Sequence, residues 1–273
     1  MKTLVLGGNG KTGRKVAERL QSHNADIRIG SRSASPAFDW EDTSTWNAAL
    51  EGVDQVYVSY QPDLAAPGAT ARIGSFTKAA ADAGVTKLVL LSGRGEEEAQ
   101  ECEQIVMASG LDWTIVRASF FNQNFSESFL VDAVAAGYVM LPVGGMREPF
   151  IDTDDIADVA VAALTDGKHS RKVYEVTGPR LMTFGEAVQE IAKATDRNIV
   201  YQEITPEEYV AVLKKYHVPA DIISLLKYLF TEVLDGRNEY LSGGVEDALG
   251  RKPTDFSEFV RKTALTGIWS QPA

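Results

Sequence analysis

Short apolar runs alternate with longer amphipathic stretches along the first half of the chain. Such runs, rich in Val, Ile and Leu, are typical of strands buried in a parallel sheet, and they occupy residues 1–6, 25–32, 55–60, 87–92 and 112–117. A further short strand is expected over 38–42, where aromatic and acidic residues alternate. Helical stretches follow most of these runs. The alternation predicts an α/β fold with a doubly wound parallel sheet.

The second half of the chain is less regular and predicts a smaller, mostly helical lobe. We expect a helix that includes Phe129 and Leu130, and then a turn or short hairpin over 137–148. A capping box of Thr183 and Glu186 marks one later helix start. The pattern thus predicts a sheet domain of residues 1–125 and 147–180, and a lobe of residues 126–146 and 181–273.

Residues 7–13 join the first strand to the first helix, and three glycines there have the G-x-G-x-x-G spacing. Gly8 permits a tight turn, Gly10 lets backbone N–H groups approach a pyrophosphate, and Gly13 lets the helix pack close to the strand. The helix start adds partial positive charge. This context favours a dinucleotide site over a structural glycine turn. A Walker-type phosphate loop is excluded because Val5 stands where it requires glycine.

The end of the second strand predicts which dinucleotide is bound. NAD-selective sites carry an acid there for the ribose 2′-hydroxyl, but residues 30–33 are Gly-Ser-Arg-Ser. Arg32, with the hydroxyls of Ser31 and Ser33, suits a 2′-phosphate, since charge-assisted hydrogen bonds are the strong ones. We therefore expect NADP, or NADPH, as cofactor. The alternative is an arginine that is merely solvated at the surface.

The composition limits the classes of partner that the protein is expected to bind. A formal net charge of −11 disfavours nucleic acid and anionic membranes, and no apolar run is long enough to span a bilayer. The single cysteine, Cys102, allows no internal disulfide, so a cytoplasmic protein is expected, with Cys102 as a small structural residue. His23, His169 and His217 have no metal-site spacing and are expected at the surface. A small-molecule substrate and a monomer or homodimer fit best.

The order of these segments resembles the atypical short-chain dehydrogenase/reductases, in particular the NmrA-like NAD(P)-binding group. The segments that carry this resemblance are 7–13, 87–92, 113–118, 122–125, 150–157, 174–178 and 249–253. Within the group, Gly10-Lys11-Thr12, the Ser-Arg-Ser of 31–33 and the Phe-Asp-Trp of 38–40 are similar to the reductases of fungal ergot-alkaloid pathways and their bacterial relatives, as well as to quinone reductases.

The resemblance implies a set of cofactor contacts. Around the pyrophosphate it places Gly7, Gly8, Asn9, Gly10, Lys11, Thr12 and Gly13, and on the 2′-phosphate Ser31, Arg32 and Ser33. It implies Asp39 and Trp40 at the adenine, Ser59 and Tyr60 at the second ribose, Ser92 and Gly93 at the nicotinamide, and Ala118, Ser119, Phe120 and Phe121 over the carboxamide. Asp39 could instead cap the helix that follows.

The sequence departs from the wider superfamily at the catalytic pair. The Tyr and Lys of ordinary members are missing from 96–104, where the residues are mostly acidic. We therefore expect an NADPH-dependent reductase whose substrate needs little acid catalysis, such as a quinone, an iminium or an enone. Ser92, Tyr60 and Asn122 are the catalytic candidates, although each could equally be structural. Alternatives are a non-enzymatic NADP(H) sensor, or a tailoring oxygenase or isomerase.

An aromatic group follows the last strand of the first half. Phe120, Phe121 and Phe125 would form a wall suited to a flat, apolar substrate. The alternative is that these rings belong to the hydrophobic core, where aromatic clusters are more common.

Overall fold

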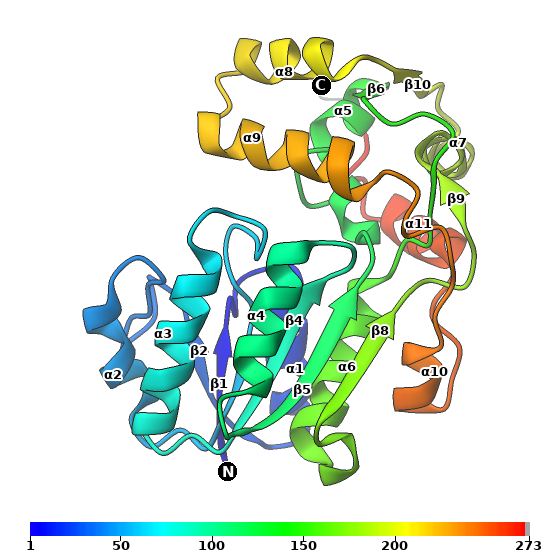
Figure 1. Ribbon diagram of the computed structural model, residues 1–273. Helices are drawn as coiled ribbons and strands as arrows, with labels where there is room; N and C mark the ends of the chain where they lie inside the picture. The colour runs from blue at the N-terminus through cyan, green and yellow to red at the C-terminus, as the bar shows by residue number, and fades with distance from the viewer. Residues whose placement is uncertain (271–273) are drawn as a thin grey trace. The chain divides into compact units, whose positions relative to one another are not determined.

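The structure is a computed structural model and describes residues 1–270. The chain forms two compact units (Figure 1). The sheet unit comprises Met1–Ala118, Thr153–Val176 and Gly243–Lys252, and the second unit comprises Ser119–Asp152, Thr177–Ser242 and residues 253–270. The divisions expected at 125, 147 and 180 thus differ from the observed ones at 118, 153 and 176, and a late segment returns to the sheet unit.

A six-stranded parallel sheet forms the sheet unit. Its order is β2 (Asp26–Gly30), β1 (Lys2–Leu6), β3 (Gln55–Val58), β4 (Lys87–Gly93), β5 (Asp112–Ala118) and β8 (Lys172–Val176). The expected doubly wound fold is confirmed. Most residues of the central strands are buried, which explains why their sequences are nearly continuous apolar runs rather than alternating ones.

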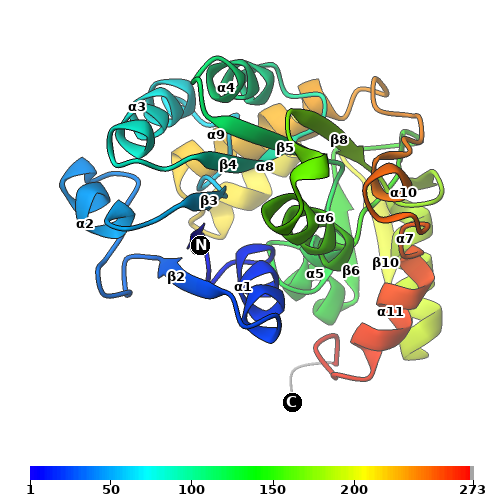
Figure 2. The ribbon, with the colours of Figure 1, turned by 90° about the horizontal axis from the view of Figure 1, so that it is seen from below.

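Helices cover both faces of this sheet, as Figure 2 shows. One face carries α2 (Trp46–Leu50), α3 (Ala69–Asp82) and α4 (Glu97–Met107), and the other carries α1 (Gly13–Ser22) and α6 (Thr153–Thr165). The short α10 (Gly244–Leu249) contacts α6 and β8, and the 3₁₀ turns η1 (Thr43–Thr45) and η3 (Gly167–His169) complete the unit. Gly244 allows this contact, because a Cβ there would lie 2.1 Å from the carbonyl oxygen of Glu175.

The strand expected over 38–42 is wrong. Phe38 and Trp40 are both buried, and this spacing imitates the alternation of a strand. Their rings instead fill a core cluster with Trp46 and Phe76 beneath α2 and α3. The backbone pairs with no strand, and the carbonyl of Asp39 accepts a hydrogen bond from the Trp46 indole. The sixth strand is β8, supplied from later in the chain.

The second unit packs short strands and helices around its own aromatic core. Its strands are β6 (Tyr138–Leu141), β7 (Arg147–Glu148), β9 (Met182–Thr183) and β10 (Val200–Glu203). Its helices are η2 (Asn122–Phe125), α5 (Val131–Ala136), α7 (Phe184–Thr195), α8 (Pro206–Lys215), α9 (Ala220–Tyr228), the π-helix η4 (Leu229–Val233) and α11 (Phe256–Ala264). The capping box of Thr183 and Glu186 at α7 is confirmed.

Three local expectations are wrong. Phe129 and Leu130 precede α5 rather than lying within it. Residues 137–148 form no hairpin, because β6 pairs in parallel with β10 and β7 pairs with β9, so each strand finds a partner far along the chain. His169 is 1% exposed, not at the surface, and its ring bonds the Tyr174 hydroxyl at 2.8 Å.

Cys102 is buried in the core of the sheet unit, as expected. Burial, with Glu101 and Glu103 nearby, raises the pKa of its thiol to about 12, so the nucleophilic thiolate is scarce at neutral pH. Among residues 1–270, no helix combines the length and apolar character that crossing a bilayer requires.

Candidate functional site

The glycine turn between β1 and α1 is shaped by contacts that leave no room for side chains. Gly7 has φ +63°, and its carbonyl accepts the N–H of Gly10 at 2.7 Å. A Cβ on Gly13 would lie 2.2 Å from the Gly7 oxygen, and one on Gly8 would lie 2.7 Å from Ile29. At Gly10 the nearest protein atom would be 3.1 Å away. Gly7, Gly8 and Gly13 thus build the turn, whereas a Cβ at Gly10 would meet the protein less closely than one at Gly8 or Gly13.

Thr12 differs from its neighbours in the turn because its side chain is buried. The Tyr57 hydroxyl donates a hydrogen bond to Thr12 Oγ1 at 3.0 Å, which ties the start of α1 to β3. Asn9 is exposed, and Gly10 and Lys11 are partly exposed. Ser59, after β3, also lies at the turn, since a Cβ on Gly7 would meet its side chain at 3.3 Å. The turn therefore presents backbone and small polar groups at the carboxyl end of β1.

The three residues after β2 form a small polar group. Arg32 and Ser33 are exposed, and the hydroxyls of Ser31 and Ser33 lie 3.3 Å apart. A guanidinium beside two hydroxyls supplies several donors for a phosphate. Such a group stands one strand away from the glycine turn, because β2 and β1 are neighbours in the sheet.

The expected adenine and ribose contacts lie at an aromatic cluster. Trp40 is 8% exposed and Tyr60 is 9% exposed, and their ring centroids are 4.9 Å apart. Burial raises the pKa of Tyr60, which is the opposite of the lysine-lowered phenol of ordinary superfamily members. Asp39 accepts the N–H of Glu41, while Asp42 provides the cap at η1.

Ser92 belongs to a buried ion network that the sequence analysis missed. Its hydroxyl donates to Glu103 Oε1 at 2.6 Å, and Glu103, fully buried on α4, forms a two-pronged ion pair with Arg117 of β5. Glu175 of β8 joins Arg117 to Arg94. Glu103 of the acidic helix thus pairs with an arginine on a neighbouring strand. The sequence of 96–104 alone does not predict this pairing. The next residue, Gly93, lies against the Glu96 side chain.

Ser92→Ala is expected to lower the free energy of unfolding by about 1.5–3 kcal/mol, because it removes a hydrogen bond to a buried carboxylate. Urea unfolding of the variant beside the wild type measures this change. Wild-type stability combined with lost turnover would contradict the structural role of the hydroxyl and favour a catalytic one.

Ala118 ends β5 in the sheet unit, while the expected residues beyond it belong to the second unit. The Ser119 hydroxyl donates to the Pro149 carbonyl at 2.6 Å, and Phe121 forms a bridge with Ile151. Asn122 is fully buried, and neither polar atom of its amide has a hydrogen-bond partner within residues 1–270. Of the three catalytic candidates, Asn122 is thus the one whose polar group is not used internally.

The expected aromatic wall divides into two parts. Phe125 is fully buried and packs against Phe150 and Phe184, so it belongs to the core. Phe120 and Phe121 are partly exposed. A more exposed ring is Phe129, which is 40% exposed and packs edge-on against Phe230 of the π-helix.

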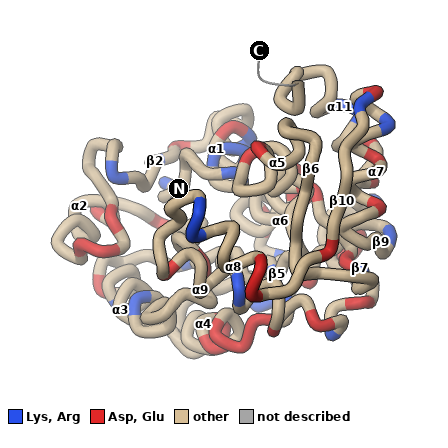
Figure 3. Tube along the Cα trace, turned by 90° about the horizontal axis from the view of Figure 1, so that it is seen from above, with Lys and Arg blue, Asp and Glu red and all other residues tan. Residues whose placement is uncertain are grey.

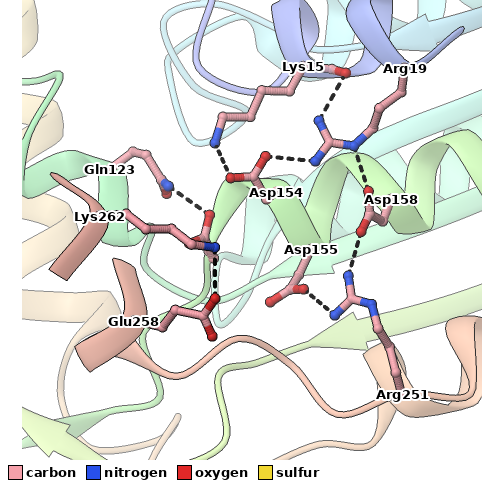
Figure 4. Close-up of polar contacts among 10 residues, drawn as sticks. Lys15, Arg19, Gln123, Asp154, Asp155, Asp158, Arg251, Glu258 and Lys262 are labelled. Carbon is pink, nitrogen blue, oxygen red and sulfur yellow. Dashed lines mark hydrogen bonds and ion pairs between the residues drawn. The ribbon is translucent and has the colours of Figure 1, made fainter. Parts of the chain in front are cut away.

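Figure 4 shows an ion cluster that fixes α1, and with it the glycine turn. On α6, Asp154 bonds Lys15 at 2.8 Å and Arg19 at 2.7 Å, and Asp158 bonds Arg19 at 2.5 Å. Arg251 reaches Asp155 at 2.6 Å and Asp158 as well. These carboxylates lie in the first two turns of α6, where the helix dipole also favours negative charge. The acidic motif at 152–155 therefore has a structural role.

The family model described as NAD(P)H-binding matches residues 7–167. Prestalk A differentiation protein A of Dictyostelium discoideum is 31% identical over 280 residues, with 96% of this chain and 92% of that protein covered. Agroclavine dehydrogenase of Claviceps fusiformis is 31% identical over 283 residues, with 95% and 96% covered. The crystal structure of an NADPH-dependent quinone oxidoreductase from Escherichia coli has a TM-score of 0.80 at 20% identity, covering 96% and 99%, which shows a shared fold.

Proposed function

We propose a substrate class and a cofactor preference for this chain, which belongs to the NAD(P)H-binding family and is an NAD(P)H-dependent reductase of its NmrA-like group. The preferred cofactor is NADPH, and the substrate is a small, flat, apolar acceptor of the quinone, iminium or enone type. The observation that carries this proposal is the pairing of a glycine turn at the start of α1 with an arginine one strand away.

The turn suits a diphosphate because its crowded glycines shape the backbone and Gly10 has no side chain to block the approach of an anion. Gly8, Asn9, Gly10, Lys11 and Thr12 would surround the diphosphate, with Gly7 and Gly13 shaping the turn. Helix α1 is ten residues long and starts here, so its first N–H groups and dipole favour an anion. Arg32, Ser31 and Ser33 would hold the 2′-phosphate, and Asp39 and Trp40 would lie near the adenine. When bound, NADPH supplies the hydride.

The remaining contacts follow from the strand order, because ligands of open α/β sheets lie beyond the carboxyl ends of the strands. Ser59 and Tyr60 after β3, and Ser92 and Gly93 at the end of β4, would flank the second ribose and the nicotinamide. Ala118 ends β5, and Ser119, Phe120 and Phe121 would follow over the carboxamide.

The second unit is proposed to supply the substrate contacts. Phe120 and Phe129 are the exposed edges of an aromatic group centred on Phe230, with ring centroids 6.3 and 6.0 Å from it. Phe230 lies in a π-helix, an element that is frequent at functional sites. Aromatic edges of this kind suit a flat, apolar acceptor. The buried, unpartnered amide of Asn122 is the candidate polar contact.

Steady-state assays with NADPH against a panel of quinones, cyclic iminium compounds and enones test the substrate class. We expect NADPH oxidation above background with at least one of the three classes, and a higher kcat/KM with NADPH than with NADH. Tight binding of NADPH without oxidation across the whole panel would contradict the proposed substrates and favour a sensor.

A further inference from the structure

Two carboxyl groups meet beside the carboxyl ends of β3 and β4. Asp63 lies in the loop after β3, and Glu96 lies between β4 and α4, at the start of the acidic stretch visible in Figure 3. The two carboxyl groups lie close enough for each to shift the pKa of the other. Glu96 is 8% exposed, whereas Asp63 is partly exposed. The pair therefore has one buried member and one that faces solvent.

Gly93 makes room for the buried member. A Cβ on Gly93 would lie 2.1 Å from Glu96 Oε2, so this carboxyl group lies directly on the backbone of the last residue of β4. The Oε2 atom is buried and has no hydrogen-bond partner within residues 1–270. Because an unpartnered buried polar atom costs free energy, its retention indicates a role other than stability.

The surroundings of the pair keep a proton on it. Burial raises the pKa of Glu96 well above its ordinary value, and the neighbouring charge of Asp63 raises it further. Glu98 and Glu103, both on α4, act in the same direction, and the Cys102 thiol is also nearby. Burial raises the pKa of Asp63 too. Two carboxyls this close do not readily both ionise, so they titrate as a unit that keeps one proton to a higher pH than an isolated carboxyl does.

The strand order places this pair on the hydride side of the proposed cofactor site. Arg32 follows β2, so the phosphorylated ribose lies on that side of the glycine turn of β1. The other half of the dinucleotide must then extend over β3 and β4, on the opposite side of β1. Adjacent strands are spaced by about 4.8 Å, so β4 lies about 10 Å from β1.

We propose that the Asp63–Glu96 pair supplies the proton that accompanies hydride transfer, in place of the missing Tyr and Lys. This inference rests on the proposed function. A quinone that gains a hydride still needs one proton: an O–H bond of the pair breaks, an O–H bond forms on the product, and the pair regains its proton from water through Asp63. An iminium ion that gains a hydride is already a neutral amine and takes no proton.

The two substrate classes therefore provide the test. In Glu96→Gln and in Asp63→Asn, the ratio of kcat/KM for a quinone to that for an iminium should fall by about 100-fold or more, the usual contribution of a general acid. In the wild type, the quinone rate should fall as pH rises through the raised pKa, while the iminium rate stays level. Glu97→Gln, an exposed neighbour on α4, is the matched control and should keep the wild-type ratio.

A second measurement needs no turnover. Carbon NMR of the glutamate and aspartate carboxyls in the cofactor-free protein should show one carboxyl that keeps its proton at neutral pH in the wild type, and the pKa of Glu96 should be lower in Asp63→Asn, where the neighbouring charge is gone. Unchanged ratios in both variants, or a pair fully ionised at neutral pH, would overturn the inference while leaving the reductase intact. If the wild type reduced none of the substrates while the NMR result was as expected, the proposed function would be contradicted instead.

Discussion

Gly10→Val is expected to abolish binding of both NADPH and NADH in a chain that still folds. A Cβ at this position would lie 3.1 Å from the Gly7 carbonyl and 3.7 Å from the Gln61 amide, so the protein itself has to yield only slightly. The valine methyls would instead fill the space that the diphosphate oxygens need. Isothermal titration calorimetry should show affinity for both dinucleotides lowered beyond detection, with a normal circular dichroism spectrum.

The control for Gly10→Val is a glycine of the same turn with a different role. Gly13→Ala would place a methyl group 2.2 Å from the Gly7 backbone oxygen, so the start of α1 must shift. This variant should lose thermal stability as well as binding. Wild-type affinity in a folded Gly10→Val protein would show that the dinucleotide lies elsewhere.

Arg32→Asp should reverse the preference between the two cofactors. A charge-assisted hydrogen bond contributes about 1.5–3 kcal/mol, so its loss alone weakens NADPH binding by about ten- to a hundred-fold. The new carboxylate also repels the 2′-phosphate and can accept a hydrogen bond from the 2′-hydroxyl of NADH. Calorimetry at one ionic strength measures the dissociation constants of NADPH and NADH, and their ratio gives the cofactor preference.

The matched control for this charge reversal is Lys215→Asp. Lys215 is exposed at the end of α8 in the second unit, and the variant changes the net charge by the same amount. It should leave the cofactor ratio unchanged. Equal weakening of NADPH and NADH by Arg32→Asp would mean that the guanidinium does not touch the 2′-phosphate.

The sheet could be predicted from the sequence because its strands carry their own signal. Residues 88–91 are all apolar, a composition that is typical of a strand buried on both faces. The segment 38–42 failed because two aromatic residues at alternate positions satisfy a tertiary cluster as well as they satisfy a strand. The spacing of Phe38 and Trp40 alone cannot distinguish a strand from an aromatic cluster, because the distinction depends on whether these rings pack against Trp46 and Phe76.

The parts of the site in which the backbone conformation requires a particular residue could be predicted from the sequence. The ion pairs between residues far apart in the sequence could not. Gly8 and Gly13 follow from the turn itself, and the structure gives each a close contact that explains it. Ser92 was singled out by its position alone, but its partner Glu103 lies eleven residues away on an acidic helix. The network closes only through Arg117 and Glu175, whose distance along the chain hides the pairing.

The sheet unit includes a segment from late in the chain, residues 243–252, so it cannot be completed until that segment has been synthesised. Arg251 pairs with Asp155 and Asp158, so these two carboxylates of α6 lack this one partner until about 250 residues have left the ribosome, whereas Lys15 and Arg19 are made before α6. A nascent chain halted at residue 242 would carry the fully buried Asp155 without this partner. Such a stalled fragment should be sensitive to protease, and protection should arise only when the final segment emerges. The ion cluster around α6 is thus completed by a segment that is synthesised more than 80 residues after the helix itself.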